Sequence, residues 1–365
     1  MSDVNLLDTD IETDLRATVR DLLADRCAPT SVTALYDGDR SLVPGLWKAL
    51  AADLGLAGLL VAEEHGGAGA TAREAAVVLE ELGRAAAPVP FLTSAVIAAT
   101  VLAHSDGDSL ARLASGESTA ALVVPFSTAP DGALPTVEVT GGVLHGAITS
   151  VAGALDADLL LVVARDGGGL VVHAVAAGDA EITPVSSFDM TRQLADVRLD
   201  GVRGTPVLAD AEPDIRAALE AGAALLASEQ AGIAQWCLES TVAYLKERHQ
   251  FGRVVGGFQA LKHRLADLYA NVESATAAAR YAAATLAAEG DDLLVATSLA
   301  QAFCGDLAVT AAEEAIQLHG GIGMTWEHPA HLYLKRAKTD QIGLGTSGAH
   351  RSRLAGLINL PRPAH

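Results

Sequence analysis

The last third of the chain holds three long proline-free segments whose apolar residues recur at helical spacing, and this pattern constrains the fold most. The segments span residues 214–248, 260–289 and 292–319, and Gly290 and Gly320 mark two of their ends. Long helices joined by short links can bury their apolar faces only against one another. The sequence therefore predicts an antiparallel helical bundle.

Two other patterns precede the bundle. Residues 9–116 are predicted to be mostly helical, because apolar residues recur at helical spacing in 10–25, 46–54 and 71–82. Residues 118–210 instead contain short apolar runs divided by Gly, Asp and Pro, which predicts a β sandwich or barrel. The predicted strands lie at residues 120–124, 136–139, 159–163, 170–175 and 195–199.

This order predicts an α+β fold with three domains. They are an N-terminal helical domain (1–117), a middle β domain (118–210) and a C-terminal helical bundle (211–365). Half of the 365 residues are apolar but only 4% are aromatic, so the core must consist mainly of Ala, Val and Leu. Such small side chains suit closely packed helices.

Charge and end sequences exclude several classes of function. The net charge is −20, and so acidic a surface repels nucleic acid. The N-terminus lacks the basic and apolar regions of a signal peptide. No uninterrupted apolar run reaches the roughly 18–20 residues of a membrane span. We therefore expect a cytoplasmic protein without a nucleic-acid or membrane partner.

Neither cysteines nor histidines predict a metal site or a disulfide. The three cysteines are far apart and odd in number, which favours buried, reduced thiols at Cys27, Cys237 and Cys304. Three histidines lie near the C-terminal glycines, but no carboxylate or Cys completes a metal-ligand spacing with His319, His328 and His331.

Two segments of the bundle could bind an anion. Residues 247–267 end one helix, turn through glycines and start the next, so that an Arg and free helix N–H groups lie together. Residues 313–325 close a helix with a Gly-Gly pair, which lets a ligand or another backbone come close. A glycine loop for a dinucleotide would open a helix, so that interpretation is excluded. Each segment alone could also be an ordinary turn.

Together with residues 58–69, 79–84 and 333–338, these segments resemble the acyl-CoA dehydrogenase family over nearly the whole chain. The resemblance implies three domains ending in a four-helix bundle, a dimer or tetramer, and bound FAD. It implies α,β-dehydrogenation of an acyl-CoA, with electron-transfer flavoprotein as partner if the chain is active. The implied FAD contacts, in part across a subunit interface, are Arg248, Gln250, Phe251, Phe258, Gln259, Gln317, Leu318, His319, Gly320, Gly321 and Thr346.

The general base that this chemistry needs is missing from both positions where the family carries it. One position is Leu344, and the other is Gly222. Glu220 lies about 200° around the helix from Gly222 and should point away. Glu229 shares the helix face but lies about 10.5 Å along the axis, so it is a weak candidate for the base.

The flavin-ring side also departs from the family. Residues 123–131 and 146–152 lack the family's acidic and Trp signatures, and Thr149 and Ser150 are weak remnants. The chain thus resembles the base-less subunit of heteromeric α2β2 acyl-CoA dehydrogenases of actinobacterial steroid side-chain catabolism. Two alternatives stay open, namely an active homo-oligomeric enzyme with a relocated base such as Glu229, and a flavin-free scaffold.

Overall fold

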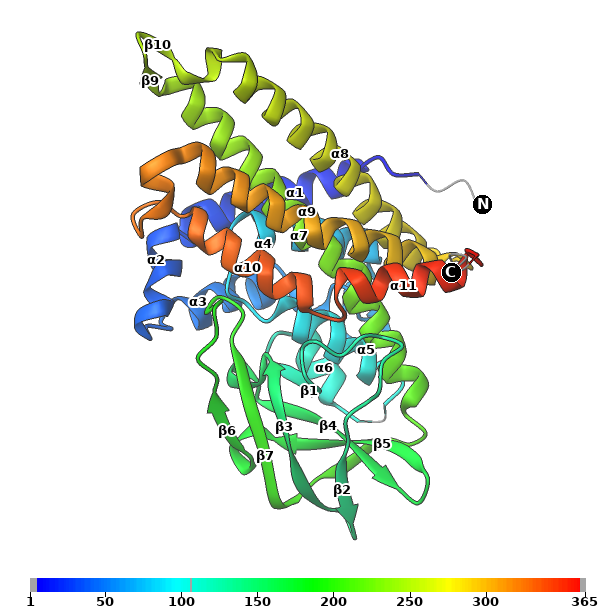
Figure 1. The fold of residues 1–365 in the computed structure, drawn as a ribbon. Helices are drawn as coiled ribbons and strands as arrows, with labels where there is room; N and C mark the ends of the chain where they lie inside the picture. The colour runs from blue at the N-terminus through cyan, green and yellow to red at the C-terminus, as the bar shows by residue number, and fades with distance from the viewer. Residues whose placement is uncertain (1–4, 106, 362–365) are drawn as a thin grey trace.

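The computed structural model describes residues 5–105 and 107–361, and it has the acyl-CoA dehydrogenase-like order of N-terminal helices, sheet and C-terminal bundle (Figure 1). One apolar core runs through the N-terminal helices and the bundle, and a second lies within the sheet. The three cysteines are buried and unpaired, as predicted.

The N-terminal helices begin where the sequence offers capping residues. Thr9 caps α1 with Glu12, and Thr71 caps α4 with Glu74, each as a reciprocal capping box. The segment around Pro88 and Pro90, which interrupt the apolar run, continues as a buried π-helical stretch, η5. The helices are α1 (Asp10–Arg26), α2 (Pro29–Thr33), α3 (Leu42–Lys48), α4 (Ala72–Arg84), η5 (Phe91–Ala98), α5 (Ala99–Leu102) and α6 (Ser109–Ala114).

The middle part is an eight-stranded mixed sheet with the order β6-β7-β3-β2-β4-β5-β8, and β1 pairs with β4. The β1 and β2 strands run parallel to β4, and the other pairs are antiparallel. Five strands match the predicted runs, whereas β3, β6 and β8 were not predicted. The strands are β1 (Ala120–Val123), β2 (Val137–Thr140), β3 (Val143–Ala152), β4 (Leu159–Asp166), β5 (Gly169–Ala176), β6 (Glu181–Pro184), β7 (Leu194–Arg203) and β8 (Thr205–Leu208).

The bundle consists of three long helices and two shorter ones. A small hairpin, β9 (His249–Gln250) and β10 (Arg253–Val254), projects beyond the joint between α7 and α8 at the upper left of Figure 1. The long helices agree with the predicted ranges to within two residues. The five are α7 (Glu212–Glu247), α8 (Gln259–Ala287), α9 (Leu293–His319), α10 (Ala330–Ile342) and α11 (Ser347–Leu357).

Helix α9 is long and apolar enough to span a membrane by length and composition, although Gly305 and Asp306 interrupt its apolar run. With the turn that follows it spans Leu293–Met324, and 61% of its most apolar window is buried inside the molecule. It packs against α7, α8, α10 and α11. Its hydropathy is therefore accounted for by its place at the centre of the bundle.

Helices α4 and α7 cross at two reciprocal glycines. A Cβ on Gly83 would overlap the carbonyl oxygen of Glu229, and a Cβ on Gly232 would overlap the carbonyl oxygen of Glu80. The missing side chains let the two backbones touch. This crossing fixes the N-terminal helices against the bundle and sets the position of Glu229.

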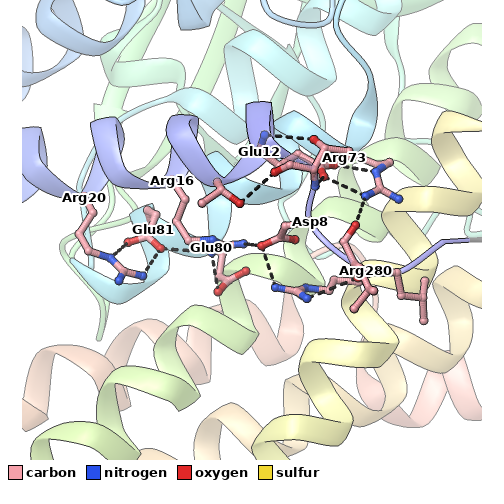
Figure 2. A network of polar contacts seen from close by, with 12 residues as sticks. Asp8, Glu12, Arg16, Arg20, Arg73, Glu80, Glu81 and Arg280 are labelled. Carbon is pink, nitrogen blue, oxygen red and sulfur yellow. Dashed lines mark hydrogen bonds and ion pairs between the residues drawn. The ribbon is translucent and has the colours of Figure 1, made fainter.

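A balanced polar network joins the first helix to α4 and α8 (Figure 2). Asp8 bridges Arg16 and Arg280 at 3.0 and 3.1 Å. The guanidinium of Arg73 binds both oxygens of Glu12, and it holds the pKa of that carboxyl at about 2. Four carboxylates thus meet four guanidiniums: Asp8, Glu12, Glu80 and Glu81 with Arg16, Arg20, Arg73 and Arg280.

Candidate functional site

The two positions that lack the general base lie side by side. A Cβ on Gly222 in α7 would lie 3.1 Å from Cδ1 of Leu344 and 2.8 Å from Cγ1 of Ile97. Leu344 is only 1% exposed and follows α10 in the left-handed conformation, with φ of +54°. The resemblance therefore located both positions at one site, and that site is apolar.

Phe126 closes the same site from the sheet side. Its ring lies against Gly343, where a Cβ would overlap it. Its carbonyl accepts a hydrogen bond of 2.7 Å from the N–H of Leu344, and its N–H donates to Ser150 at 2.9 Å. The cavity between these groups is only about 20 Å³, which is room for about one water molecule. Ligand sites usually have about 300–1,000 Å³, so this cavity has no room for a flavin ring with an acyl group.

The pocket walls contain no carboxylate. They are formed by Thr93, Ile97, Leu122, Val124, Pro125, Phe126, Ala152, Leu219 and Leu344. A general base must reach the transferred proton within about 2.6–3.2 Å or through one water. None of these nine residues is an acid–base side chain of the kind that removes a proton from a substrate.

Glu229 faces a buried cluster of charges instead of this pocket. Its Oε1 accepts 2.6 Å hydrogen bonds from both Arg192 and Arg336. Arg192 also donates to Asp340 at 3.1 Å, and Arg336 donates to the hydroxyl of Thr191 at 2.9 Å. Because Arg192 and Thr191 come from the loop between β6 and β7 and the others from α7 and α10, the cluster fastens this part of the middle domain to the bundle.

The electrostatics of the cluster oppose a role for Glu229 as a base. Burial alone would raise the pKa of Glu229, but the guanidiniums of Arg192 and Arg336 outweigh burial and lower the pKa to about 2. Burial and the neighbouring Glu229 raise the pKa of Asp340 to about 8. A carboxylate held so firmly in its ionised form is a poor proton acceptor.

Glu220 points away from the vacant site, as its helix position predicts. It forms a two-bond ion pair with Arg353 of α11, at 2.7 and 3.2 Å. The pair borders a separate groove of about 830 Å³ between the N-terminal helices and the bundle. Neither Glu220 nor Glu229 therefore lines the pocket at Leu344, one of the two positions where the resemblance places the base.

The candidate FAD residues of the hairpin are exposed and free to meet another molecule. Residues 251 and 252 form a two-residue turn in which both have positive φ, +55° for Phe251 and +76° for Gly252. The tight turn of the hairpin requires this conformation, which is strained for Phe. The ring of Phe251 meets Phe258 edge-on with 6.2 Å between centres, and Phe251 remains 90% exposed. Arg248 and Gln250 are also exposed, and Phe258 is half-buried under the guanidinium of Arg253, 3.8 Å above its ring.

The second group of candidates lies at the same end of the bundle. The ring of His319 is buried and stacks on Tyr244 of α7 with 4.5 Å between the ring centres. It can therefore offer a ligand little beyond its backbone. The neighbouring candidates Gln317, Gly320 and Gly321 are exposed, as is Gln259, and Leu318 is half-buried. Thr346 is distant in sequence and caps α11 through a 3.2 Å bond from Ala349.

Sequence reasoning missed the residues that close and fasten the site. Arg192, Arg336 and Asp340 form the buried cluster, and Phe126 fills the pocket. A loop arginine carries no periodic signal, so its burial was not predictable from spacing. The one sequence signal for this site was the presence of Gly222 and Leu344 at the two positions where the family carries an acid.

Comparison with known proteins identifies the family. Residues 9–115 match the acyl-CoA dehydrogenase N-terminal domain, and residues 213–357 match the acyl-CoA dehydrogenase C-terminal domain. Acyl-CoA dehydrogenase IpdE2 of Mycobacterium tuberculosis is 40% identical over 325 residues, which cover 88% of this chain and 89% of that protein.

Solved structures also match this chain over nearly its whole length. The ChsE4-ChsE5 complex from Mycobacterium tuberculosis has a TM-score of 0.85 at 26% identity, and the match covers 98% of this chain and 100% of that chain. The Tcur3481-Tcur3483 steroid ACAD has a TM-score of 0.83 at 28% identity, with 96% and 98% covered. The chain belongs to the acyl-CoA dehydrogenase family, whose cofactor is FAD.

Proposed function

We propose that the chain is the base-less subunit of a heteromeric acyl-CoA dehydrogenase and completes the FAD site of a catalytic partner subunit. The observation that carries this proposal is the contact between Gly222 and Leu344, the two vacant base positions, in a pocket closed by Phe126. A subunit with this pocket has no group that can remove the α-proton of an acyl-CoA.

The residues at the hairpin end of the bundle fit the ADP half of FAD. An exposed Arg248 and the N–H groups at the start of α8 suit a diphosphate, and the exposed ring of Phe251 suits stacking on a base. When bound, FAD accepts the hydride from the β-carbon of the substrate. This chain's part is to hold the cofactor across the interface and exclude water, with Gln250, Gln259, Gln317, Leu318, Gly320 and Gly321 around it and Thr346 near the vacant site.

The comparisons support a heteromeric assembly and a steroid-related acyl-CoA. ChsE4-ChsE5 is a complex, and the Tcur3481-Tcur3483 protein is described as a steroid ACAD. We infer an α2β2 arrangement in the cytoplasm, with electron-transfer flavoprotein reoxidising the flavin of the active sites. The division into domains 1–117, 118–210 and 211–365 belongs to the same proposal.

The first experiment is the visible absorption spectrum of the chain purified alone and co-purified with an acyl-CoA dehydrogenase encoded beside it. We expect flavin absorption only in the co-purified sample, and bleaching of that absorption by a suitable acyl-CoA. Flavin in the chain alone that an acyl-CoA bleaches would contradict the proposal and favour an active homo-oligomer. A colourless protein in every assembly would favour the flavin-free scaffold.

A further inference from the structure

We propose that Met324 and Trp326, with Lys335 between two aromatic rings, form the anchor by which this chain docks onto its flavin-loaded partner subunit. The inference rests on the proposed function and adds residues to which neither the FAD contacts nor the base positions assign a role. The surface that they form with Tyr36 and Ile322 is called the anchor patch below.

The anchor patch exposes apolar groups that no residue in 5–105 or 107–361 fully covers. Met324 is 83% exposed, Trp326 is 62% exposed and Ile322 is 43% exposed. All three follow the Gly320–Gly321 turn within a few residues. Large apolar side chains that are exposed this close together on one segment usually mark an interaction site.

The anchor patch is also rigid. The ring of Trp326 meets Tyr36 edge-on with 5.6 Å between centres, and it meets His331 at 4.6 Å. The ammonium of Lys335 lies 3.9 Å from the Trp326 ring and 4.0 Å from the Tyr36 ring. An aromatic side chain already fixed in its bound orientation loses little entropy on docking, and Trp is among the commonest binding hot spots.

The segment that carries Met324 and Trp326 is held near the candidate FAD residues. His328, two residues after Trp326, lies 4.0 Å from His319, and the buried His319 stacks on Tyr244, which precedes the hairpin. These contacts hold the segment against the end of α7, beside the hairpin and the Gly320–Gly321 turn. A partner that places its FAD against the hairpin and this turn would also cover Met324 and Trp326.

This end of the bundle carries more basic than acidic residues, unlike the rest of the chain. Residues 244–263 and 319–338 hold seven of the 25 Lys and Arg residues but only two of the 45 Asp and Glu residues. One of the seven, Arg336, is buried in the ion cluster, and Lys338 pairs with Glu313 at 3.4 Å, which leaves five for the surface. A basic end on a chain of net charge −20 favours an anionic partner surface.

These observations commit to one occupant, an acyl-CoA dehydrogenase subunit whose facing surface is acidic and carries an apolar recess. Its bound FAD adds the negative charge of the diphosphate. A second copy of this chain is a poorer occupant in a two-fold dimer, because the basic ends would then face each other.

The test measures binding of the separately purified partner subunit, loaded with FAD, to wild type, Met324→Asp and Trp326→Ala. Ile11→Asp is the matched control, because Ile11 is 71% exposed on α1, away from the anchor patch. We expect Met324→Asp and Trp326→Ala each to raise Kd at least about tenfold, and Ile11→Asp to leave Kd unchanged. Salt should weaken wild-type binding, and the thermal midpoint of Met324→Asp should equal that of wild type.

The outcomes separate this inference from the proposed function. If Met324→Asp binds as tightly as wild type and the complex carries flavin, the anchor is refuted and the proposed function stands. If wild type forms no complex with the partner, both are overturned. If the wild-type chain forms a homodimer that Met324→Asp disrupts, the occupant is a second copy and the inference is wrong about the partner.

Discussion

Replacing Glu229 with Gln tests whether this residue fastens the middle domain to the bundle or acts as a relocated base. The substitution keeps the shape of the side chain and removes its charge. Two buried guanidiniums, Arg192 and Arg336, would each lose a 2.6 Å charge-assisted hydrogen bond, while both remain at least 94% buried. An amide oxygen can accept their hydrogens but cannot balance their charge.

The expected loss follows from the burial of the ion pairs of Glu229. Removal of one partner from a buried ion pair typically costs about 3–5 kcal/mol. The guanidiniums of Arg192 and Arg336 lower the pKa of Glu229, so this stabilisation is present above the unfolded pKa and is lost as the pH falls through the folded pKa.

The assay is urea unfolding at neutral pH, with Glu239→Gln as the matched control. Glu239 lies on the same helix and also has a 2.6 Å ion pair, to Arg84, but its side chain is 52% exposed. An exposed pair is worth about 0–1 kcal/mol. We expect Glu229→Gln to lose about 3 kcal/mol or more and Glu239→Gln to lose at most about 1 kcal/mol.

Equal losses in the two variants would refute the fastening role. Turnover of the assembled enzyme, measured below the unfolding temperature, decides the other question. We expect Glu229→Gln to keep its turnover once folded and partner-bound. A loss of about a thousandfold or more with normal stability would instead identify Glu229 as the base and restore the homo-oligomeric alternative.

Three further predictions concern packing, pH and the vacant site. Gly232→Ala should destabilise the protein by about 1–3 kcal/mol in urea unfolding, because its Cβ would overlap the Glu80 carbonyl, whereas Gly45→Ala, with open space around it, should stabilise α3 by up to about 1 kcal/mol. Because the pKa of Asp340 is raised in the folded state, the protonated carboxyl of Asp340 stabilises the fold. This stabilisation is fully present below about pH 4 and is lost as the pH rises toward 8. Asp340→Asn should therefore flatten the dependence of unfolding free energy on pH between 5 and 8, and an unchanged slope would contradict that pKa. Leu344→Glu should lower stability by about 2 kcal/mol or more, because it buries an unpaired carboxyl, and should give the isolated chain no turnover in a dye-reduction assay. Turnover would mean that the flavin-ring space is intact.

Periodicity predicted the long helices well because their signal is spread over many residues. Helix α7 was expected at 214–248 and spans Glu212–Glu247. Strand β3 was missed because Gly146 interrupts its apolar pattern, and its pairing with β7 contains register shifts. Alternation of apolar and polar residues does not predict a strand where a glycine is needed for close packing. Gly146 is such a residue, because a Cβ there would lie 2.9 Å from Cγ1 of Val137.

The candidate site also contains some residues that the sequence could single out and others that it could not. The sequence could single out Gly222 and Leu344, because they change the residue type at two positions of a specific motif, and the structure places the two residues side by side. The position of Arg192 could not be recognised from the sequence, because it lies in a loop and its partners Glu229 and Asp340 are 37 and 148 residues away in sequence. Long-range ion pairs leave no spacing that one sequence can reveal.

The residue types at Gly222 and Leu344 and the closure of the pocket support each other physically. Because Gly222 has no side chain and Leu344 is apolar, the two can pack together, and the N–H of Leu344 can bond to the carbonyl of Phe126. A carboxylate at either position would disturb this packing and would lose its hydration without gaining a partner. The exposed hairpin end lies elsewhere and takes no part in this packing. Under the proposed function, a subunit without a base can therefore still offer its hairpin end to a partner's FAD.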